Sequence, residues 1–356
     1  MSPLERNRWS DSPEVSTTGR PDGQDGRPHA QYESLIRACR SIPPIQTAVV
    51  HPCDASSLEA AIAAAIGKLI EPVLIGPETR IREVAVKLGV DITNLKLINA
   101  PHSHAAAALA VELARSGTVG ALMKGSLHTD ELLAEVVRTD TGIRTARRIS
   151  HVFVMDVPTY PKPLFITDAA VNLFPTLEEK VDIVQNAIDL THALGLQMPK
   201  VAILSAVETI TSKIPSTIDA AALCKMADRG QITGALLDGP LALDNAISRD
   251  AAAVKGIRST VAGDADILLV PTLEAGNMLV KELTFLANAD AAGIVLGAQV
   301  PIILSSRADS VRSRLASCAV VALFARHKYV QVLIPTQPAP AQPSIDTHQP
   351  STGAVK

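Results

Sequence analysis

The sequence predicts an α/β protein, and three observations lead to that class. Short apolar runs alternate with Ala-rich helical segments along most of the 356 residues, a pattern that predicts βαβ units with right-handed crossovers and a mainly parallel sheet. Hydrophobic residues make up 47% of the chain, which supports a large buried core. Aromatic residues make up only 3%, so the core must consist of Ala, Val, Ile and Leu, as in parallel sheets that are covered by helices.

The expected elements follow each other in chain order. The apolar runs predict strands at 47–51, 72–76, 96–99, 119–123, 151–156, 164–167, 200–205, 232–238, 266–270, 293–296 and 301–304. The helical segments predict helices at 55–69, 78–88, 103–116, 177–194, 217–228, 275–287 and 309–324. The strands at 151–156 and 164–167 are joined by the Pro-rich turn VPTYPKP and interrupt the alternation, so we expect an antiparallel insertion there. We expect the chain to cross between two domains close to this insertion, at about 145–150.

Two tails are predicted, at residues 1–30 and 335–356. Both are rich in turn-forming and polar residues and lack periodic apolar positions, so neither can bury enough apolar surface to offset the entropy of ordering. We therefore expect both tails to be disordered. Trp9, the only tryptophan, is expected to lie outside the core.

Composition and charge exclude several classes of protein. The formal net charge of −3 argues against a basic nucleic-acid binder. The most apolar stretch, 291–304, is short and contains Gln299 and Pro301, so it is not expected to span a membrane, and the first 30 residues lack the apolar core of a secretory signal. The four cysteines are scattered without a C-x-x-C pair, which predicts reduced thiols in a cytoplasmic protein.

Functional residues are expected in the loops after strands, because ligands of open α/β sheets bind beyond the carboxyl ends of the strands. In LMKGSLHT, Lys124, Gly125 and Ser126 follow the strand that ends at Met123. A Gly-containing loop that enters a helix presents backbone N–H groups to an anion, and Lys124 adds positive charge. The alternative is an ordinary loop with a solvent-facing lysine.

A cluster of arginines follows that loop. Its members are Arg138, Arg144, Arg147 and Arg148. Guanidinium groups bind phosphate oxygens two at a time, so the cluster suits a phosphorylated ligand near the expected domain boundary. A solvated surface patch is the alternative.

Two further loops carry polar side chains. In ITDAAVNLFPT, Asp168 and Asn172 follow a buried strand, and Asp168 either orients an arginine or caps a turn, whereas Thr176 is expected to cap the next helix. The second loop, LEAGN and the residues after it, contributes Glu274, Gly276, Asn277 and Lys281. Gly276 permits close backbone approach, and Lys281 falls on the same helical face as Asn277. The alternative is a helix start at which the glutamate complements the dipole.

The segment SSRADS precedes the last predicted helix. Ser306 and Asp309 have the S-x-x-D spacing of a capping box, so the alternative to a functional role is simply a helix start. Together with Ser310 and Ser313 they also form one polar stripe on the helix. Arg307 opposes the helix dipole unless an anion binds there, which favours a functional site.

Taken together, these segments resemble the phosphate acetyltransferase/phosphate butyryltransferase family. The matching stretches are MKGSLHT (123–129), GIRT (142–145), SHV (150–152), ITDAAVN (166–172), DGPLALDNAIS (238–248), LEAGN with Lys281, and SSRADS (305–310). They occur in family order and cover roughly residues 40–325. The SHV and DGPLALDNAIS stretches are more similar to the butyryl branch.

The resemblance implies a fold and an activity. The fold is a pair of parallel-sheet α/β domains with a central cleft, like that of isocitrate and isopropylmalate dehydrogenases; residues 31–148 plus 300–334 would form domain I, and 149–299 domain II. The activity is reversible acyl transfer between acyl-CoA and inorganic phosphate, which gives acyl phosphate and CoA. The resemblance also implies a homo-oligomer, with CoA as a substrate and without a metal, a permanently bound cofactor or a covalent acyl-enzyme.

The resemblance also assigns residues. Ser306 is expected to hydrogen-bond the reacting centre, Arg307 and Arg144 to hold phosphate together with Lys124, and Asn277 and Lys281 to line the cleft. The other expected cleft residues are Ser126, Asp168, Asn172, Glu274 and Gly276.

One position departs from the family pattern. The acetyl branch carries an Asp seven residues after the motif serine, where this chain has Ser313. Asp309, one helical turn after Ser306, is therefore our candidate for the base that removes the proton of the CoA thiol, with helix capping as its alternative role.

Two other functions remain as alternatives. One is an NAD-dependent hydroxy-acid dehydrogenase on the same fold, although no G-x-G-x-x-G follows a strand. The other is a non-catalytic domain that senses acyl-CoA or acyl phosphate, which the missing Asp favours. A thiol assay with acyl phosphate and CoA separates the three, because only the transferase consumes thiol without a nicotinamide.

Overall fold

The structure is a computed structural model that describes residues 30–304 and 309–333. The predicted tails, including Trp9, lie outside the described residues apart from Ala30. Ser306 and Arg307 also lie outside them.

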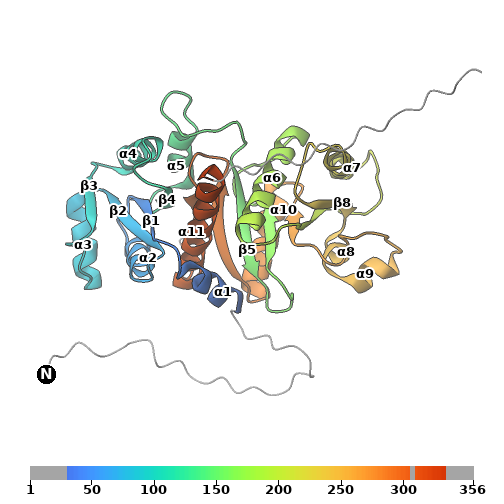
Figure 1. Cartoon of the computed structure of the whole chain (residues 1–356), viewed down its shortest axis with the longest axis horizontal. Coiled ribbons are helices and arrows are strands. Elements are labelled where there is room, and N and C mark those ends of the chain that lie inside the picture. Colours follow the sequence, from blue (N-terminus) through green and yellow to red (C-terminus); the bar gives the residue numbers. More distant parts are fainter. Residues whose placement is uncertain (1–29, 305–308, 334–356) are drawn as a thin grey trace, which may run out of the picture.

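Eleven strands among the described residues form one continuous sheet in the order β3-β2-β1-β4-β11-β10-β5-β6-β9-β7-β8 (Figure 1). The strands are β1 (Ile45–Val50), β2 (Ile70–Gly76), β3 (Lys96–Asn99), β4 (Ala121–Lys124), β5 (Ser150–Asp156), β6 (Leu164–Thr167), β7 (Lys200–Leu204), β8 (Leu236–Leu241), β9 (Ile267–Leu269), β10 (Asp290–Leu296) and β11 (Ile302–Ile303). The helices are α1 (Ala30–Cys39), α2 (Ala55–Ile66), α3 (Glu78–Leu88), α4 (Ser103–Arg115), α5 (Thr129–Val136), α6 (Leu177–Ala193), α7 (Pro215–Asp228), α8 (Leu243–Ile247), α9 (Arg249–Val254), α10 (Leu273–Leu286) and α11 (Val311–Leu333).

The sheet is parallel at both sides and antiparallel in the middle. Strands β3-β2-β1-β4-β11 pair in parallel, and so do β6-β9-β7-β8. The pairs β11–β10, β10–β5 and β5–β6 are antiparallel, because short connections such as those between β5 and β6 and between β10 and β11 leave no room for a crossover helix. The predicted α/β class and the antiparallel insertion of β5 and β6 are confirmed. One continuous, mostly parallel sheet is present in place of two separate sheets, and the division into two domains stays a prediction.

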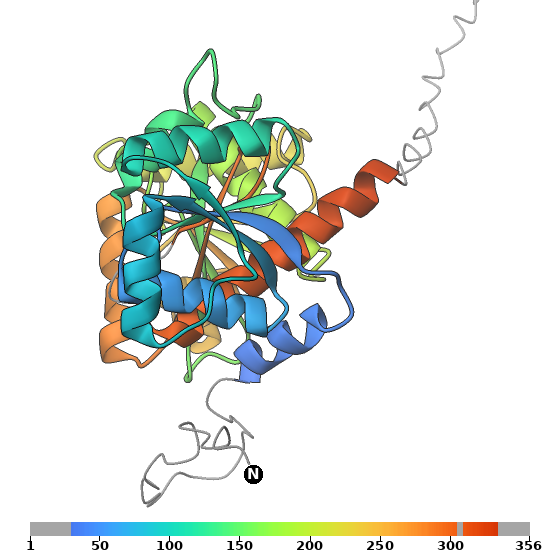
Figure 2. The ribbon, with the colours of Figure 1, turned by 90° about the vertical axis from the view of Figure 1, so that its left-hand side faces the viewer.

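Helices cover both faces of the sheet, as Figures 1 and 2 show. Helices α1, α2, α3, α6, α7 and α11 contribute to the core on one face, and α4, α5, α8 and α10 contribute to the core on the other. Side chains of each strand alternate between the two cores: Val49 of β1 belongs to the first, and Ala48 and Val50 belong to the second. Such aliphatic residues on both faces are what a buried parallel sheet requires.

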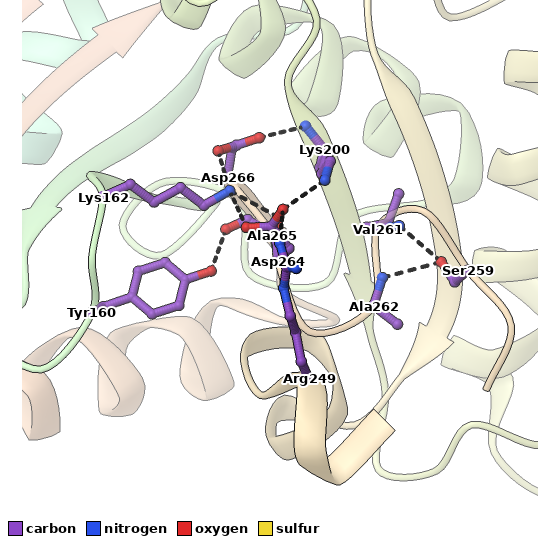
Figure 3. Close-up of polar contacts among 10 residues, drawn as sticks. All are labelled: Tyr160, Lys162, Lys200, Arg249, Ser259, Val261, Ala262, Asp264, Ala265 and Asp266. Carbon is purple, nitrogen blue, oxygen red and sulfur yellow. Dashed lines mark hydrogen bonds and ion pairs between the residues drawn. The ribbon is translucent and has the colours of Figure 1, made fainter. Parts of the chain in front are cut away.

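A network of charges, which we call the Asp264 cluster, joins the amino ends of β6, β7 and β9 (Figure 3). It consists of Lys162, Lys200, Arg249, Asp264 and Asp266. Lys162 Nζ lies 2.9 Å from Asp264 Oδ1 and 2.6 Å from Asp266 Oδ1. Lys200 Nζ and Arg249 Nη2 lie 2.6 and 3.0 Å from Asp264 Oδ2. The cluster fixes one end of these three strands, and their carboxyl ends lie at the opposite edge.

No helix within the described ranges is long and apolar enough to cross a membrane.

Candidate active site

A cavity of about 630 Å3 lies where β4 and β11 end, against α10 and the central strands β5 and β10. It is lined by Lys124, Leu127, His128, Thr129, His151, Phe153, Ala170, Asn277, Val280, Lys281, Thr284, Phe285, Ala289, Asp290, Ala291, Leu304, Asp309, Ser310 and Ser313. Its wall therefore combines two lysines, several hydroxyl and carboxylate groups, and an apolar surface. Concave sites of this composition are typical of small-molecule binding.

Lys124 reaches the cavity from the end of β4, where the chain turns closely around β1. The Gly125 N–H donates to Val50 O at 2.9 Å, and a Cβ at Gly125 would lie only 2.3 Å from that oxygen, so no larger residue fits. Ser126 Oγ donates to His51 O at 2.8 Å and accepts from Cys53 N at 3.2 Å. Ser126 thus connects two loops and is not among the lining residues, whereas Lys124 is.

Asp168 and Asn172 hold the turn after β6. The Asp168 carboxylate accepts hydrogen bonds from Ala170 N, Val171 N and Asn172 Nδ2 at 2.9, 3.0 and 2.6 Å. Burial raises the pKa of Asp168, and these hydrogen bonds act in the opposite direction. Asn172 Oδ1 in turn accepts from Arg148 Nε at 2.8 Å. Neither Asp168 nor Asn172 lines the cavity, but the turn that they hold contributes Ala170 to its wall.

The four clustered arginines divide into two kinds. Three of them have carboxylate partners: Arg138 with Asp140 at 3.2 Å, Arg147 with Asp189 at 3.3 Å and Arg148 with Glu179 at 2.8 Å. Arg144 has no ion pair with any described residue, its side chain is exposed, and its backbone forms a β-bridge with Ala298. It lies outside the lining residues of the cavity.

Helix α10 brings two predicted residues to the cavity. A Cβ at Gly276 would lie 2.8 Å from Ala169 Cβ, so the glycine lets the helix pack directly on the turn after β6. Asn277 Nδ2 donates to Ala169 O at 3.2 Å, and Lys281 lies one helical turn further on, as the predicted shared face requires. Gly276 itself is buried in this packing and Glu274 is exposed; neither lines the cavity.

Helix α11 begins at Val311, two residues later than predicted. Ser310 Oγ accepts a hydrogen bond from Ser313 N at 3.1 Å, so the cap of this helix is Ser310. The alternative interpretation, in which Ser306 and Asp309 form the helix start, was therefore wrong about the position of the cap. Asp309 precedes the cap and lines the cavity together with Ser310 and Ser313. Residues 305–308 lie outside the described residues, and the residues on either side of them, Leu304 and Asp309, both line the cavity.

His151 is a lining residue to which the sequence analysis gave no role. It lies on β5, its side chain is only 1% exposed, and its ring centroid is 4.2 Å from that of Phe153. Burial lowers the pKa of His151 to about 3, and the backbone of Leu304 acts in the opposite direction. Neither ring nitrogen makes a hydrogen bond of normal geometry to a residue that the structure describes. The only signal in the sequence was its place in the SHV stretch.

Of the predicted site residues within the described ranges, the cavity therefore brings together Lys124, Asn277, Lys281 and Asp309. It does not include Ser126, Arg144, Asp168, Asn172, Glu274 or Gly276. Four of these six, Ser126, Asp168, Asn172 and Gly276, have structural contacts that position the loops around it.

A family model and similar proteins of known name show the family of the chain. The family model described as phosphate acetyl/butaryl transferase matches residues 103–322. The chain is 64% identical to a phosphate acetyltransferase of Rhizobium meliloti over 304 residues, covering 85% of this chain and 96% of the relative. It is 41% identical to a phosphate butyryltransferase of Clostridium acetobutylicum over 297 residues, covering 83% and 99%. The crystal structure of a branched-chain phosphotransacylase from Enterococcus faecalis V583 is similar with a TM-score of 0.68 at 30% identity, covering 79% and 99%.

Proposed function

Because the chain belongs to the phosphate acetyltransferase/phosphate butyryltransferase family, we propose that its cavity is where an acyl group passes between coenzyme A and inorganic phosphate. The enzyme is a phosphate acyltransferase. In one direction a phosphate oxygen attacks the thioester carbonyl, the C–O bond forms, the C–S bond breaks and the thiolate leaves. In the other direction the CoA thiol gives its proton to a base and the thiolate attacks the carbonyl carbon of the acyl phosphate; the C–S bond forms, the C–O bond breaks and phosphate leaves.

The observation that carries this proposal is the meeting of Lys124, Lys281 and Asp309 in one cavity with an apolar wall. Both substrates are polyanions, and two ammonium groups favour their binding. The apolar surface suits the acyl chain. Asp309 provides a carboxylate of the kind that accepts a proton from a thiol.

We assign the phosphate to Arg144, Arg307 and Lys124. Arg144 lies outside the lining residues of the cavity; its assignment is supported by its being the one arginine of the four that has no carboxylate partner among the described residues. Its guanidinium is thus available for bidentate binding of an oxyanion. The role of Arg307 rests on the family motif.

We assign the proton transfer to Asp309 and the hydrogen bond to the reacting centre to Ser306. Ser310 already caps α11, so capping does not explain the acidic residue at 309. Asn277 would position substrate from the opposite wall, where it lies with Lys281.

We expect acetyl as the acyl group, although the SHV and DGPLALDNAIS stretches are more similar to the butyryl branch. The relative named for acetyl transfer is 64% identical, whereas the one named for butyryl transfer is 41% identical. Measuring kcat/KM with acetyl phosphate and with butyryl phosphate tests this expectation; a preference for butyryl phosphate would contradict it.

We further propose that the enzyme has two domains, that it lies in the cytoplasm and that it forms a homo-oligomer. The cavity wall combines Lys124 and Asp309 from residues 31–148 plus 300–334 with His151 and Lys281 from residues 149–299, which supports a cleft between two domains as in isocitrate and isopropylmalate dehydrogenases. The four cysteines are free thiols, which is consistent with the cytoplasm. A homo-oligomer is expected from the family.

The test is the consumption of CoA thiol in the presence of acetyl phosphate, with and without a nicotinamide. A transferase consumes thiol without the nicotinamide. A sensing domain would bind CoA without consuming it, and a dehydrogenase would require the nicotinamide; either result would overturn the proposal.

A further inference from the structure

His151 occupies a defined place in the cavity wall. A Cβ at Gly293, which faces the ring from the neighbouring strand β10, would lie 2.9 Å from His151 Nε2 and 2.9 Å from Leu304 O. The imidazole therefore fills the space above Gly293, beside the end of β11. Phe153 lies against the ring and also lines the cavity. Gly293 of β10 and Phe153 of β5 thus fix the position of the imidazole.

Packing alone does not explain a histidine at this position. A buried polar group without a hydrogen bond destabilises the fold, and an apolar side chain of the same shape would avoid that cost. Neither nitrogen of the 1% exposed His151 makes a hydrogen bond of normal geometry to a described residue, and His151 lines a cavity that is open to a ligand. Buried polar atoms of this kind are expected where a ligand supplies the missing partner.

The surroundings of the ring indicate which part of the ligand it meets. The aromatic ring of Phe153 packs against the imidazole, whereas the lysines among the described lining residues of the cavity are Lys124 and Lys281. Phosphate groups are expected beside the cations. A neutral imidazole has one N–H donor and suits an uncharged carbonyl oxygen.

Building on the function proposed above, we propose that His151 donates a hydrogen bond to the carbonyl oxygen of the transferred acyl group. When phosphate or thiolate attacks the carbonyl carbon, negative charge develops on this oxygen, and the N–H of His151 stabilises it. The ring keeps its proton throughout, and no bond to histidine forms or breaks. A donor that is already positioned in a dry wall strengthens most in the transition state. Burial keeps the imidazole neutral at working pH.

The test compares His151→Phe with the wild-type enzyme in the thiol assay. Removing one donor to an oxyanion lowers kcat by about 10²–10³-fold, and we expect the KM values for CoA and phosphate to change by less than about twofold. Because the substitution also removes unpaired polar atoms, the Tm should stay the same or rise. A residue with a purely structural role would instead lower the Tm and leave kcat unchanged.

His192→Phe provides the matched control. The His192 ring pairs through Nε2 with Gly234 O at 2.8 Å, away from the residues of the cavity. We expect this variant to lower the Tm, because it loses a structural hydrogen bond, and to keep kcat. A lower kcat with an unchanged or higher Tm in His151→Phe, together with an unchanged kcat and a lower Tm in His192→Phe, is expected only if His151 donates to the ligand.

If His151→Phe does not fold, the kcat values of two further variants with side chains of similar length, His151→Gln and His151→Met, test the proposal. His151→Gln retains an N–H donor and His151→Met does not, so the Gln variant should have the higher kcat. Equal kcat values for these two variants, a wild-type kcat for His151→Phe, or an effect confined to the KM for phosphate would each overturn the assignment. If the wild-type enzyme consumes no thiol, the function proposed above fails instead.

Discussion

Arg144 can be tested separately from the arginines around it. Because it has no carboxylate partner among the described residues, Arg144→Ala should weaken phosphate binding without breaking an ion pair. Hydrogen bonds to charged groups contribute roughly 1.5–3 kcal/mol, so we expect the KM for phosphate to rise by about 10-fold or more. Arg144→Lys should restore only part of the loss, since an ammonium cannot bind two oxygens in the same plane. Steady-state kinetics with varied phosphate measure the effect.

Arg147→Ala is the control for that prediction. Arg147 lies three residues further on and pairs with Asp189 at 3.3 Å. We expect its loss to leave the KM for phosphate unchanged. An unchanged KM in Arg144→Ala, together with a raised KM in Arg147→Ala, would show that the wrong arginine was chosen.

Substitutions of Asp309 and Ser310 distinguish a role in catalysis from a role in helix capping. Asp309→Asn should lower turnover by about 10²–10⁴-fold, as for loss of a general base, and the loss should shrink at higher pH, where more thiolate is present without help. Helix α11 should still form in this variant, because Ser310 supplies its cap. Ser310→Ala should lower the free energy of unfolding by about 0.5–2 kcal/mol. A nearly silent Asp309→Asn would mean that the proton leaves by another route.

Residues on predicted helix faces and strand ends could be identified from the sequence, but His151 could not. Lys124 follows a strand, and Asn277 and Lys281 are four residues apart on one helix, so local spacing predicts their place. The proposed role of His151 depends on the absence of a hydrogen bond of normal geometry to any described residue, and that is a property of the packed protein. The same holds for Ser126, whose hydrogen bonds run to a loop 75 residues away.

At the scale of elements, the contact between α10 and the turn after β6 positions one wall of the cavity. Gly276→Ala would place a Cβ 2.8 Å from Ala169 Cβ and push the helix outward. We expect a loss of about 1–3 kcal/mol in the free energy of unfolding, as for an overpacked core. The KM for CoA should rise as well, because Asn277 and Lys281 move with the helix. Denaturant unfolding and steady-state kinetics measure the two effects.

Gly67→Ala is the matched control for a glycine at a helix. Its Cβ would lie 3.3 Å from Ala63 O, and its φ of −68° suits any residue. We expect little change in stability or KM. If both glycine variants behaved alike, the close packing of α10 would not be the cause.

Each of the eleven strands was predicted, but their directions were only partly predicted. Local apolar runs indicate that a strand is present, whereas the direction in which it pairs depends on distant connections. Strand β10 illustrates this, because it runs antiparallel to both β5 and β11 although its sequence resembles that of a buried parallel strand. Helices α1, α5, α8 and α9 were not among the predicted helices. Of these, α8 and α9 have only five and six residues, which are too few to establish a helical period.

At the scale of the whole molecule, the antiparallel centre joins two parallel halves into one sheet. The cavity lies against that centre, with Lys124 on one side and Lys281 on the other. The Asp264 cluster stabilises the half that contains β6, β7 and β9, at the edge away from their carboxyl ends. The stability of this half and the chemistry of the cavity are therefore carried by different residues and can be tested independently.

The Asp264 cluster should make the stability of the molecule depend on acid pH. Burial alone would raise the pKa of Asp264, but its bonds to Lys200 and Lys162 outweigh burial and hold the pKa well below its usual range. Because the unfolded chain then binds more protons than the folded chain in acid, this stabilisation is complete above about pH 5 and is lost as the pH falls toward the folded pKa.

Asp264→Asn should therefore lower the free energy of unfolding by about 1–3 kcal/mol at pH 7, and by less at pH 3. Asp140→Asn, which removes an exposed pair with Arg138, should leave the urea midpoint unchanged. Parallel urea curves for wild type and Asp264→Asn, with the same difference at both pH values, would show that the charge of Asp264 contributes nothing.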